Sequence, residues 1–205
     1  MAKIKSNEDV FKGQVIHWIK KQIDIGSLPF KNATNDPSLY GLPTVRFPDV
    51  LLALDFECRQ PFCGWELKTP KTNARDKKLL KDAVEKAQTI NAKYFVTWNM
   101  QTAIIWRTPE KNRTTVTEQY KIYERSDPRI TDVNDIRDSV KALLLEDMCF
   151  RLLLDLHQLY NDEKINLHTA DTTIFVKIVS NASDKMSVLL LKDLNRQRGN
   201  KDFQV

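Results

Sequence analysis

The sequence predicts an α/β fold, in which a mixed sheet is flanked by helices and followed by a helical C-terminal extension. Apolar runs bounded by turn residues are typical of strands, and two of them occur at residues 47–54 and 62–68. An amphipathic helix is expected at 76–91, and two more strands follow it. This order of strand, strand, helix and strand indicates a sheet with a crossover helix.

The first predicted element is a helix from Asn7 to Ile25. Ser6, with Asp9 three residues later, resembles a capping box, and apolar residues then recur at helical spacing along one face. Residues 26–46 contain several glycines and prolines, so they are predicted to form a long loop.

The elements after the two apolar runs complete the predicted sheet. The helix at 76–91 carries its apolar residues on one side, as a helix packed on a sheet does. Strands are predicted at Tyr94–Trp98 and Ala103–Arg107, with an edge strand at Thr115–Tyr123. Residues 1–125 are therefore expected to form one domain.

Residues 126–205 are predicted to form a helical extension or connector. The composition shifts around residues 126–128, and a long helix is expected from Val133 to Tyr160. A second helical region is expected from Ala170 to Arg198. The polar end of the chain suits a linker, and the sequence leaves open whether the chain is a fragment of a larger polypeptide.

Charged residues interrupt the two apolar runs that precede the helix. Asp49 lies in the first run, and Glu66 and Lys68 end the second. A carboxylate in an apolar strand costs free energy unless a cation or hydrogen-bond donors compensate it. Antiparallel pairing across the polar residues 58–61 would bring Asp49 near Glu66 and Lys68. Alternation along the strand would put these last two on one face, so a small charged pocket is predicted.

Such a pocket has the composition of a divalent-metal site. Mg²⁺ prefers oxygen ligands and is usually held by one or two carboxylates plus substrate phosphate. Asp49 and Glu66 are the predicted carboxylate ligands, with the backbone carbonyl of Leu67 as a further ligand. Lys68 is expected to orient the attacking water or to stabilise the transition state. The reaction implied is hydrolysis of a phosphodiester.

A purely structural interpretation is the alternative. Asp49 would then be a strand-entry residue, and Glu66 and Lys68 would form an exposed ion pair that contributes little. The pattern of a carboxylate, any residue and a lysine occurs twice more, at 76–78 and 162–164, but in polar surroundings. The apolar context of Glu66 and the single Pro-Asp dipeptide of the chain favour the metal site.

The pair Pro48-Asp49, followed by Glu66-Leu67-Lys68, resembles the signature of the PD-(D/E)XK nuclease superfamily. The resemblance covers about residues 1–125. This part of the chain is similar to the nuclease domains at the N-terminus of type I or fused restriction–modification polypeptides. It implies a restriction-endonuclease-like core in which Asp49 and Glu66 bind Mg²⁺, for which Mn²⁺ can substitute. Lys68 matches the catalytic lysine of the family.

The resemblance also implies two further site residues. Glu8 matches a glutamate that completes the metal site in some relatives, although a first-turn acid favoured by the helix dipole explains it equally well. Gln88 matches a catalytic glutamine of the helix, but Ala92 stands where some relatives have a tyrosine. The implied activity is a DNA endonuclease of prokaryotic restriction or phage defence. Recognition, methyltransferase or motor modules would then lie in the same polypeptide or complex.

The charge of the chain agrees with a polyanionic partner without proving one. The formal net charge is +5, and six basic residues lie in one stretch at and after the predicted site: Lys68, Lys71, Arg75, Lys77, Lys78 and Lys81. These residues form either a solvated surface or a phosphate contact. Double-stranded DNA is the expected partner, and RNA is less favoured because no aromatic stacking platform is evident.

The remaining features indicate an ordinary globular protein. No apolar run is long enough to span a membrane and no signal peptide is evident, so a cytoplasmic location is expected. The cysteines number three and are expected to be free thiols. Two other functions stay open: an inactive nucleic-acid-binding module that retains the nuclease fold, and a helical assembly subunit that works through residues 133–198.

Overall fold

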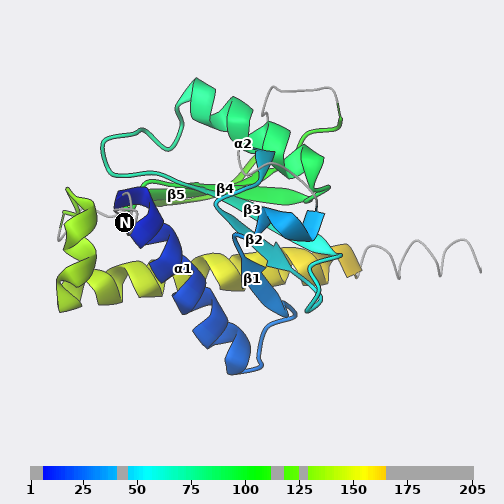
Figure 1. Ribbon diagram of the computed structural model, residues 1–205, viewed down its shortest axis with the longest axis horizontal. Coiled ribbons are helices and arrows are strands. Elements are labelled where there is room, and N and C mark those ends of the chain that lie inside the picture. The colour runs from blue at the N-terminus through cyan, green and yellow to red at the C-terminus, as the bar shows by residue number, and fades with distance from the viewer. Residues whose placement is uncertain (1–6, 41–45, 112–117, 125–128, 165–205) are drawn as a thin grey trace, which may run out of the picture. The chain divides into compact units, whose positions relative to one another are not determined.

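A computed structural model describes residues 7–40, 46–111, 118–124 and 129–164. In this part of the chain the strands form one six-stranded mixed sheet in the order β1-β2-β3-β4-β5-β6, with helices beside it (Figure 1). The predicted α/β class, with a mixed sheet flanked by helices, is confirmed. The elements are α1 (Asn7–Asp24), β1 (Asn32–Thr34), η1 (Pro37–Tyr40), β2 (Val50–Ala53), β3 (Pro61–Leu67), α2 (Lys77–Thr89), β4 (Tyr94–Trp98), β5 (Thr102–Arg107), β6 (Gln119–Glu124), η3 (Val133–Arg137) and a helix at 139–164.

The chain divides into two compact units, Met1–His157 and Gln158–Val205. The sheet, α1, α2 and the helical residues 139–157 all belong to the first unit. This unit therefore runs past the composition shift at 126–128 and includes residues assigned above to the extension. The second unit contributes only residues 158–164 to the described part of the chain.

Strand pairing follows the predicted hairpin and crossover. β2 and β3 are antiparallel with Val50 opposite Trp65, and β3 and β4 are parallel, connected by α2. The other neighbouring strands are antiparallel. Continuing the β2–β3 register by one residue places Asp49 opposite Glu66. The hairpin geometry that was predicted to bring these carboxylates together is thus present.

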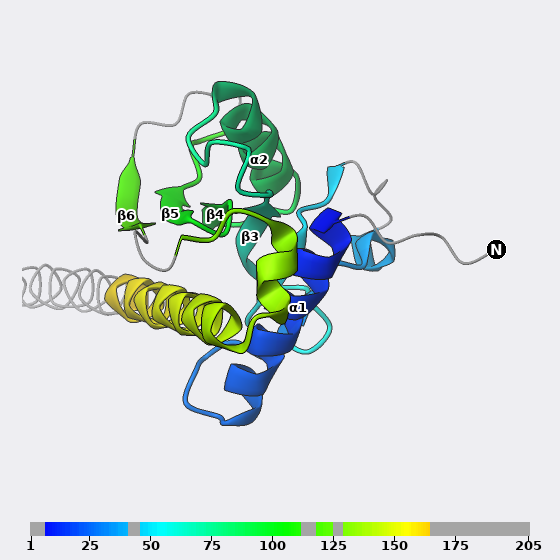
Figure 2. The same cartoon turned by 90° about the vertical axis from the view of Figure 1, so that its left-hand side faces the viewer.

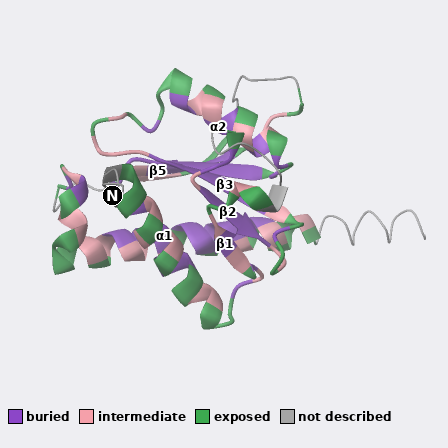
Figure 3. Ribbon diagram, in the orientation of Figure 1, coloured by how far each residue is buried: buried purple, intermediate pink, exposed green. Residues whose placement is uncertain are grey.

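The helices lie on both faces of the sheet. In Figure 2, α2 lies on one side, whereas α1 and the helical residues 139–157 lie on the other. Beneath α2, its apolar residues pack on strand residues such as Leu51, Phe95 and Ile104. On the other face, the Phe11 ring of α1 meets Trp98 edge-on at 5.0 Å between ring centroids. Figure 3 shows buried residues concentrated along the sheet and on the helix sides that face it.

Two predicted elements are wrong in part. The segment 26–46 is not all loop, because Asn32–Thr34 form β1 and Pro37–Tyr40 form a 3₁₀ turn. β1 is only three residues long, too short for its alternation to stand out in the sequence, and it is defined by its pairing with β2. The predicted helix Val133–Tyr160 is divided, since η3 ends at Arg137 and the α-helix begins at residue 139.

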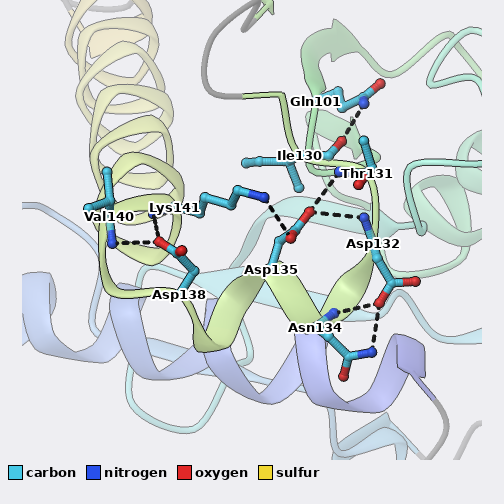
Figure 4. A network of polar contacts seen from close by, with 9 residues as sticks. All are labelled: Gln101, Ile130, Thr131, Asp132, Asn134, Asp135, Asp138, Val140 and Lys141. Carbon is cyan, nitrogen blue, oxygen red and sulfur yellow. Dashed lines mark hydrogen bonds and ion pairs between the residues drawn. The ribbon is translucent and has the colours of Figure 1, made fainter.

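Asp138 explains that division. Its Oδ1 accepts hydrogen bonds from the backbone N–H groups of Val140 and Lys141, at 2.9 and 3.0 Å, so it caps the α-helix. Asp135, inside η3, accepts from the N–H groups of Thr131 and Asp132 and pairs with Lys141 at 2.7 Å (Figure 4). These contacts fix the turn between β6 and the long helix.

Other expectations concern residues at the limits of the described structure. The helical region 170–198, the Ser6 cap and the first residues of the edge strand 115–123 lie outside it, at least in part. Cys58, Cys63 and Cys149 form no disulfide, in agreement with the predicted thiols, and all three are buried. Among the described residues, no helix is both long and apolar enough to span a membrane.

Candidate functional site

Asp49 lies at the entrance to β2, where the backbone of β3 passes close by. Gly64 of β3 lies close to Pro48, since a Cβ added at Gly64 would be in van der Waals contact with the Cβ of Pro48 at 3.4 Å. The Oδ2 atom of Asp49 accepts a hydrogen bond of 2.9 Å from the backbone N–H of Leu67. Its Oδ1 lies 2.8 Å from the Nζ of Lys12 on α1. Two donors therefore hold this carboxylate at the end of β3.

Glu66 lies on the face of β3 that α2 covers, and only 2% of its side chain is exposed. Its Oε2 is 2.9 Å from the Nζ of Lys86, which also lies 2.9 Å from Oδ2 of Asp82. Its Oε1 is buried and has no hydrogen-bond partner. Burying a carboxylate oxygen without a hydrogen-bond donor costs free energy, and no contact of Oε1 offsets this cost.

Burial is the main influence on the ionisation of Glu66. Desolvation, followed by repulsion from Asp49, raises the pKa of Glu66 to about 7 from its usual 4.5, against the opposing attraction of Lys86. Although burial alone would lower the pKa of Lys86, attraction from Glu66 and hydrogen bonds to Asp82 and Glu66 raise it. Lys86 is therefore charged at neutral pH, whereas Glu66 is near the midpoint of its titration.

Lys68 and Glu8 form the outer part of the cluster. The backbone N–H of Lys68 donates to the carbonyl of Trp98 at 2.8 Å, which ties the end of β3 to β4. The Nζ of Lys68 lies 3.5 Å from Oε2 of Glu8 on α1. Glu66 thus pairs with a cation from α2, whereas Lys68 pairs with an acid from α1.

The structure brings together most of the predicted site residues. Asp49, Leu67 and Glu66 meet at the β2–β3 pairing, and Lys68 with Glu8 follows at the end of β3. Gln88 makes other contacts: its Nε2 donates to the carbonyls of Pro109 and Glu110, at 3.2 and 2.9 Å. These contacts anchor the segment after β5.

Sequence reasoning missed Lys12, Lys86 and Asp82. The Asp82–Lys86 spacing of four residues is the pattern of an exposed helical ion pair, yet the Lys86 side chain is only 13% exposed. Lys12 follows Phe11 in a helix with many charged residues, and nothing local marks it. Both lysines join the cluster through the packing of a helix on the sheet.

The donor set is suited to a hard cation. No group of three or more histidine, cysteine, aspartate or glutamate side chains gathers around a common point in the described ranges. The carboxylates of Asp49 and Glu66 form a pair, and Mg²⁺ is commonly held by such a pair, with water and substrate phosphate filling its other positions. The unpartnered Oε1 of Glu66 is an available oxygen ligand of this kind.

A cavity of about 380 Å³ opens beside the cluster along α2. Lys86 and Asp82 line it together with Arg46 and Lys111, which come from the segments before β2 and after β5. The cavity therefore reaches Lys86 and Asp82, whereas Asp49 and Glu66 are not among its lining residues.

No protein-family model matches this chain, and neither a curated protein nor a solved structure matches it.

Proposed function

We propose that this chain is a Mg²⁺-dependent DNA endonuclease domain whose core is of the PD-(D/E)XK type. The observation that carries the proposal is the meeting of Asp49 and Glu66 across the β2–β3 pairing, with one oxygen of Glu66 buried and unpartnered. An arrangement that serves stability alone would not leave a buried carboxylate oxygen without a donor.

Asp49 and Glu66 would hold the ion, with the backbone carbonyl of Leu67 as a third ligand. Glu8, which pairs with Lys68 at 3.5 Å, would be a further candidate ligand. The bound ion supplies a water of lowered pKa and offsets negative charge on the phosphate. The fit rests on oxygen donors alone, which agrees with Mg²⁺ or Mn²⁺ rather than with zinc.

The lysines divide the remaining tasks. Lys68 stands at the open end of β3, where its ammonium can hydrogen-bond the attacking water and stabilise charge on the phosphate oxygens. Lys12 and Lys86 each pair with one carboxylate and compensate the repulsion between Asp49 and Glu66. Lys86 binds Oε2 of Glu66 and leaves Oε1 without a partner, whereas Lys12 binds Oδ1 of Asp49, so a cation held by both carboxylates would share Asp49 with Lys12.

The biological setting that suits this activity is prokaryotic restriction or phage defence. Target recognition, methylation and any DNA motor would then belong to other modules of the same polypeptide or complex. Cleavage by this chain alone would be weak and show little sequence specificity.

Cleavage of supercoiled plasmid in Mg²⁺ or Mn²⁺ tests the proposal. We expect nicking by the wild-type chain that EDTA abolishes, and a loss of about 100-fold or more in both Lys68→Ala and Asp49→Ala. Glu85→Gln is the matched control, because Glu85 is an exposed acid on α2 whose ion-pair partner in the described part of the chain is the exposed Lys81. Metal-dependent nicking that survives both site substitutions would show that the site is misplaced.

An inactive nucleic-acid-binding module is the second candidate. It is favoured by the same two lysines, since each carboxylate already has an ammonium partner within 2.9 Å. Such a module would bind DNA without cleaving it and would not bind Mn²⁺ at Asp49. Cleavage and metal binding therefore separate the two candidates.

A further inference from the structure

The connection between β3 and α2, residues 68–76, is held rigidly against the end of β4. The hydroxyl of Thr97 donates to the carbonyl of Ala74 at 2.8 Å, and the Asn99 amide donates to the carbonyl of Thr72 at 2.6 Å. Thr97 and Asn99 are 0% and 5% exposed. Two buried polar side chains thus fix the backbone of a connection that has no regular structure of its own.

A polar cavity of about 380 Å³ lies beside this connection. Its walls come from the connection, from the β4–β5 turn and from Glu124 of β6. The Oδ1 of Asn99 accepts hydrogen bonds from the N–H groups of Gln101 and Thr102, at 3.1 and 2.7 Å. The turn wall of the cavity is therefore as well fixed as the connection wall.

Two cations line the cavity, and neither is strongly engaged. Lys71 is exposed, and no acid in the described ranges pairs with it. Arg75 approaches Glu124 only to 3.9 Å, and the two side chains are 49% and 64% exposed. An exposed pair at this distance contributes little, so the guanidinium is free to bind an anion.

We propose that this cavity is a phosphate-binding subsite, in which Lys71 and Arg75 hold a backbone phosphate of the nucleic acid strand. The identity of the ligand rests on the proposed function, because Lys68 lies three residues before Lys71, at the same end of β3. A planar guanidinium and a nearby ammonium are suited to the two free oxygens of a phosphodiester. The rigid connection fixes the distance between this phosphate and the carboxylate pair.

Binding of a fluorescein-labelled DNA duplex, followed by anisotropy in EDTA over a series of KCl concentrations, tests the subsite without turnover. For Lys71→Ala/Arg75→Ala we expect affinity to fall about tenfold or more. The slope of log K against log[KCl] should fall by about 1 to 2, the value for one or two lost phosphate contacts. Lys71→Arg/Arg75→Lys, which keeps both charges, should retain most of the affinity.

The matched control is Lys20→Ala/Lys31→Ala, which removes the same charge from exposed residues of α1 and the segment before β1. It should leave the salt slope unchanged. If Lys71→Ala/Arg75→Ala behaves like this control, the inference is overturned. Inorganic phosphate should compete with the duplex more than KCl at equal ionic strength does, because it occupies the same subsite, and Lys71→Ala/Arg75→Ala should abolish this excess competition.

The outcome is independent of the cleavage test. If the wild-type chain nicks plasmid and Lys71→Ala/Arg75→Ala binds DNA normally, the proposed function is supported and the subsite is refuted. If the wild-type chain does not cleave DNA but Lys71→Ala/Arg75→Ala loses DNA binding, the subsite is supported and the nuclease activity is refuted.

Discussion

Glu66 lies under α2 with 1% of its surface exposed, and only one of its two carboxylate oxygens has a hydrogen-bond partner. Lys86 compensates part of the cost of burying this charge, and Asp49 adds to that cost. A residue kept at such an expense of stability is more readily explained by chemistry than by folding.

Glu66→Gln should stabilise the metal-free protein at pH 8. The pKa of Glu66 is about 7 in the folded protein and near 4.5 when unfolded, so the folded state binds the proton more tightly. Stability from this group is fully present below pH 4.5 and is lost as the pH rises through 7. We expect the variant to be more stable at pH 8 by on the order of 2 kcal/mol and to have a flatter pH profile.

Urea unfolding in EDTA at several pH values between 5 and 8 measures this effect. Glu85→Gln serves as the control, because Glu85 is exposed on the same helix. A Glu66→Gln variant that is less stable than wild type at pH 8 would mean that the ion pair with Lys86 outweighs the cost of burial.

At the scale of elements, the long helix is positioned by the short turn that precedes it. Asp138 caps the helix, and Asp135 joins η3 to it through Lys141. A periodic apolar pattern continues through both elements, and for that reason sequence reasoning merged them into one helix. The break is encoded by the hydrogen bonds of two aspartates, which favour caps and turns over helix interiors.

Asp135→Asn should destabilise the protein at neutral pH by about 1 kcal/mol, as the loss of a helix-end contact does. The Lys141 ion pair and the N–H groups of Thr131 and Asp132 lower the pKa of Asp135 to about 2 from 3.8. Its contribution is present above pH 3.8 and is lost as the pH falls toward 2. The difference from wild type, measured by urea unfolding, should therefore be constant above pH 5 and shrink as the pH falls from 3.8 toward 2.

Asp147→Asn is the comparison for this prediction, since Asp147 pairs with Arg151 on an exposed helix surface. It should change stability by less than Asp135→Asn does. An equal effect of both substitutions, or a difference that does not depend on pH, would contradict the role given to Asp135.

At the scale of the whole molecule, the features that depend on local sequence patterns were predicted, whereas those that depend on tertiary packing were not. β4 and α2 were anticipated closely, because a short apolar run and a one-sided apolar helix pattern are both visible within a few residues. The approach of Asp49 to Glu66 followed from hairpin pairing alone. Lys12 and Lys86 reach the same cluster only because α1 and α2 pack on opposite faces of the sheet, and no local spacing contains that information.

The cluster therefore depends on the assembled sheet and both helices. The two carboxylates come from neighbouring strands, and their counter-ions come from helices on opposite faces. The polar cavity beside residues 68–76 lies at the same end of β3 as Lys68 and depends on the end of β4 for its walls. The central claim is that this end of the sheet binds a divalent cation between Asp49 and Glu66.

Isothermal titration of the wild-type chain with Mn²⁺, beside Asp49→Asn, Glu66→Gln and Glu85→Gln, tests that claim most directly. Loss of a carboxylate ligand removes an oxygen donor and a negative charge, so we expect Asp49→Asn and Glu66→Gln to weaken Mn²⁺ binding about tenfold or more. Glu85→Gln should bind as wild type does. If wild type binds no Mn²⁺, or if both site variants bind it unchanged, the carboxylate pair is not a metal site.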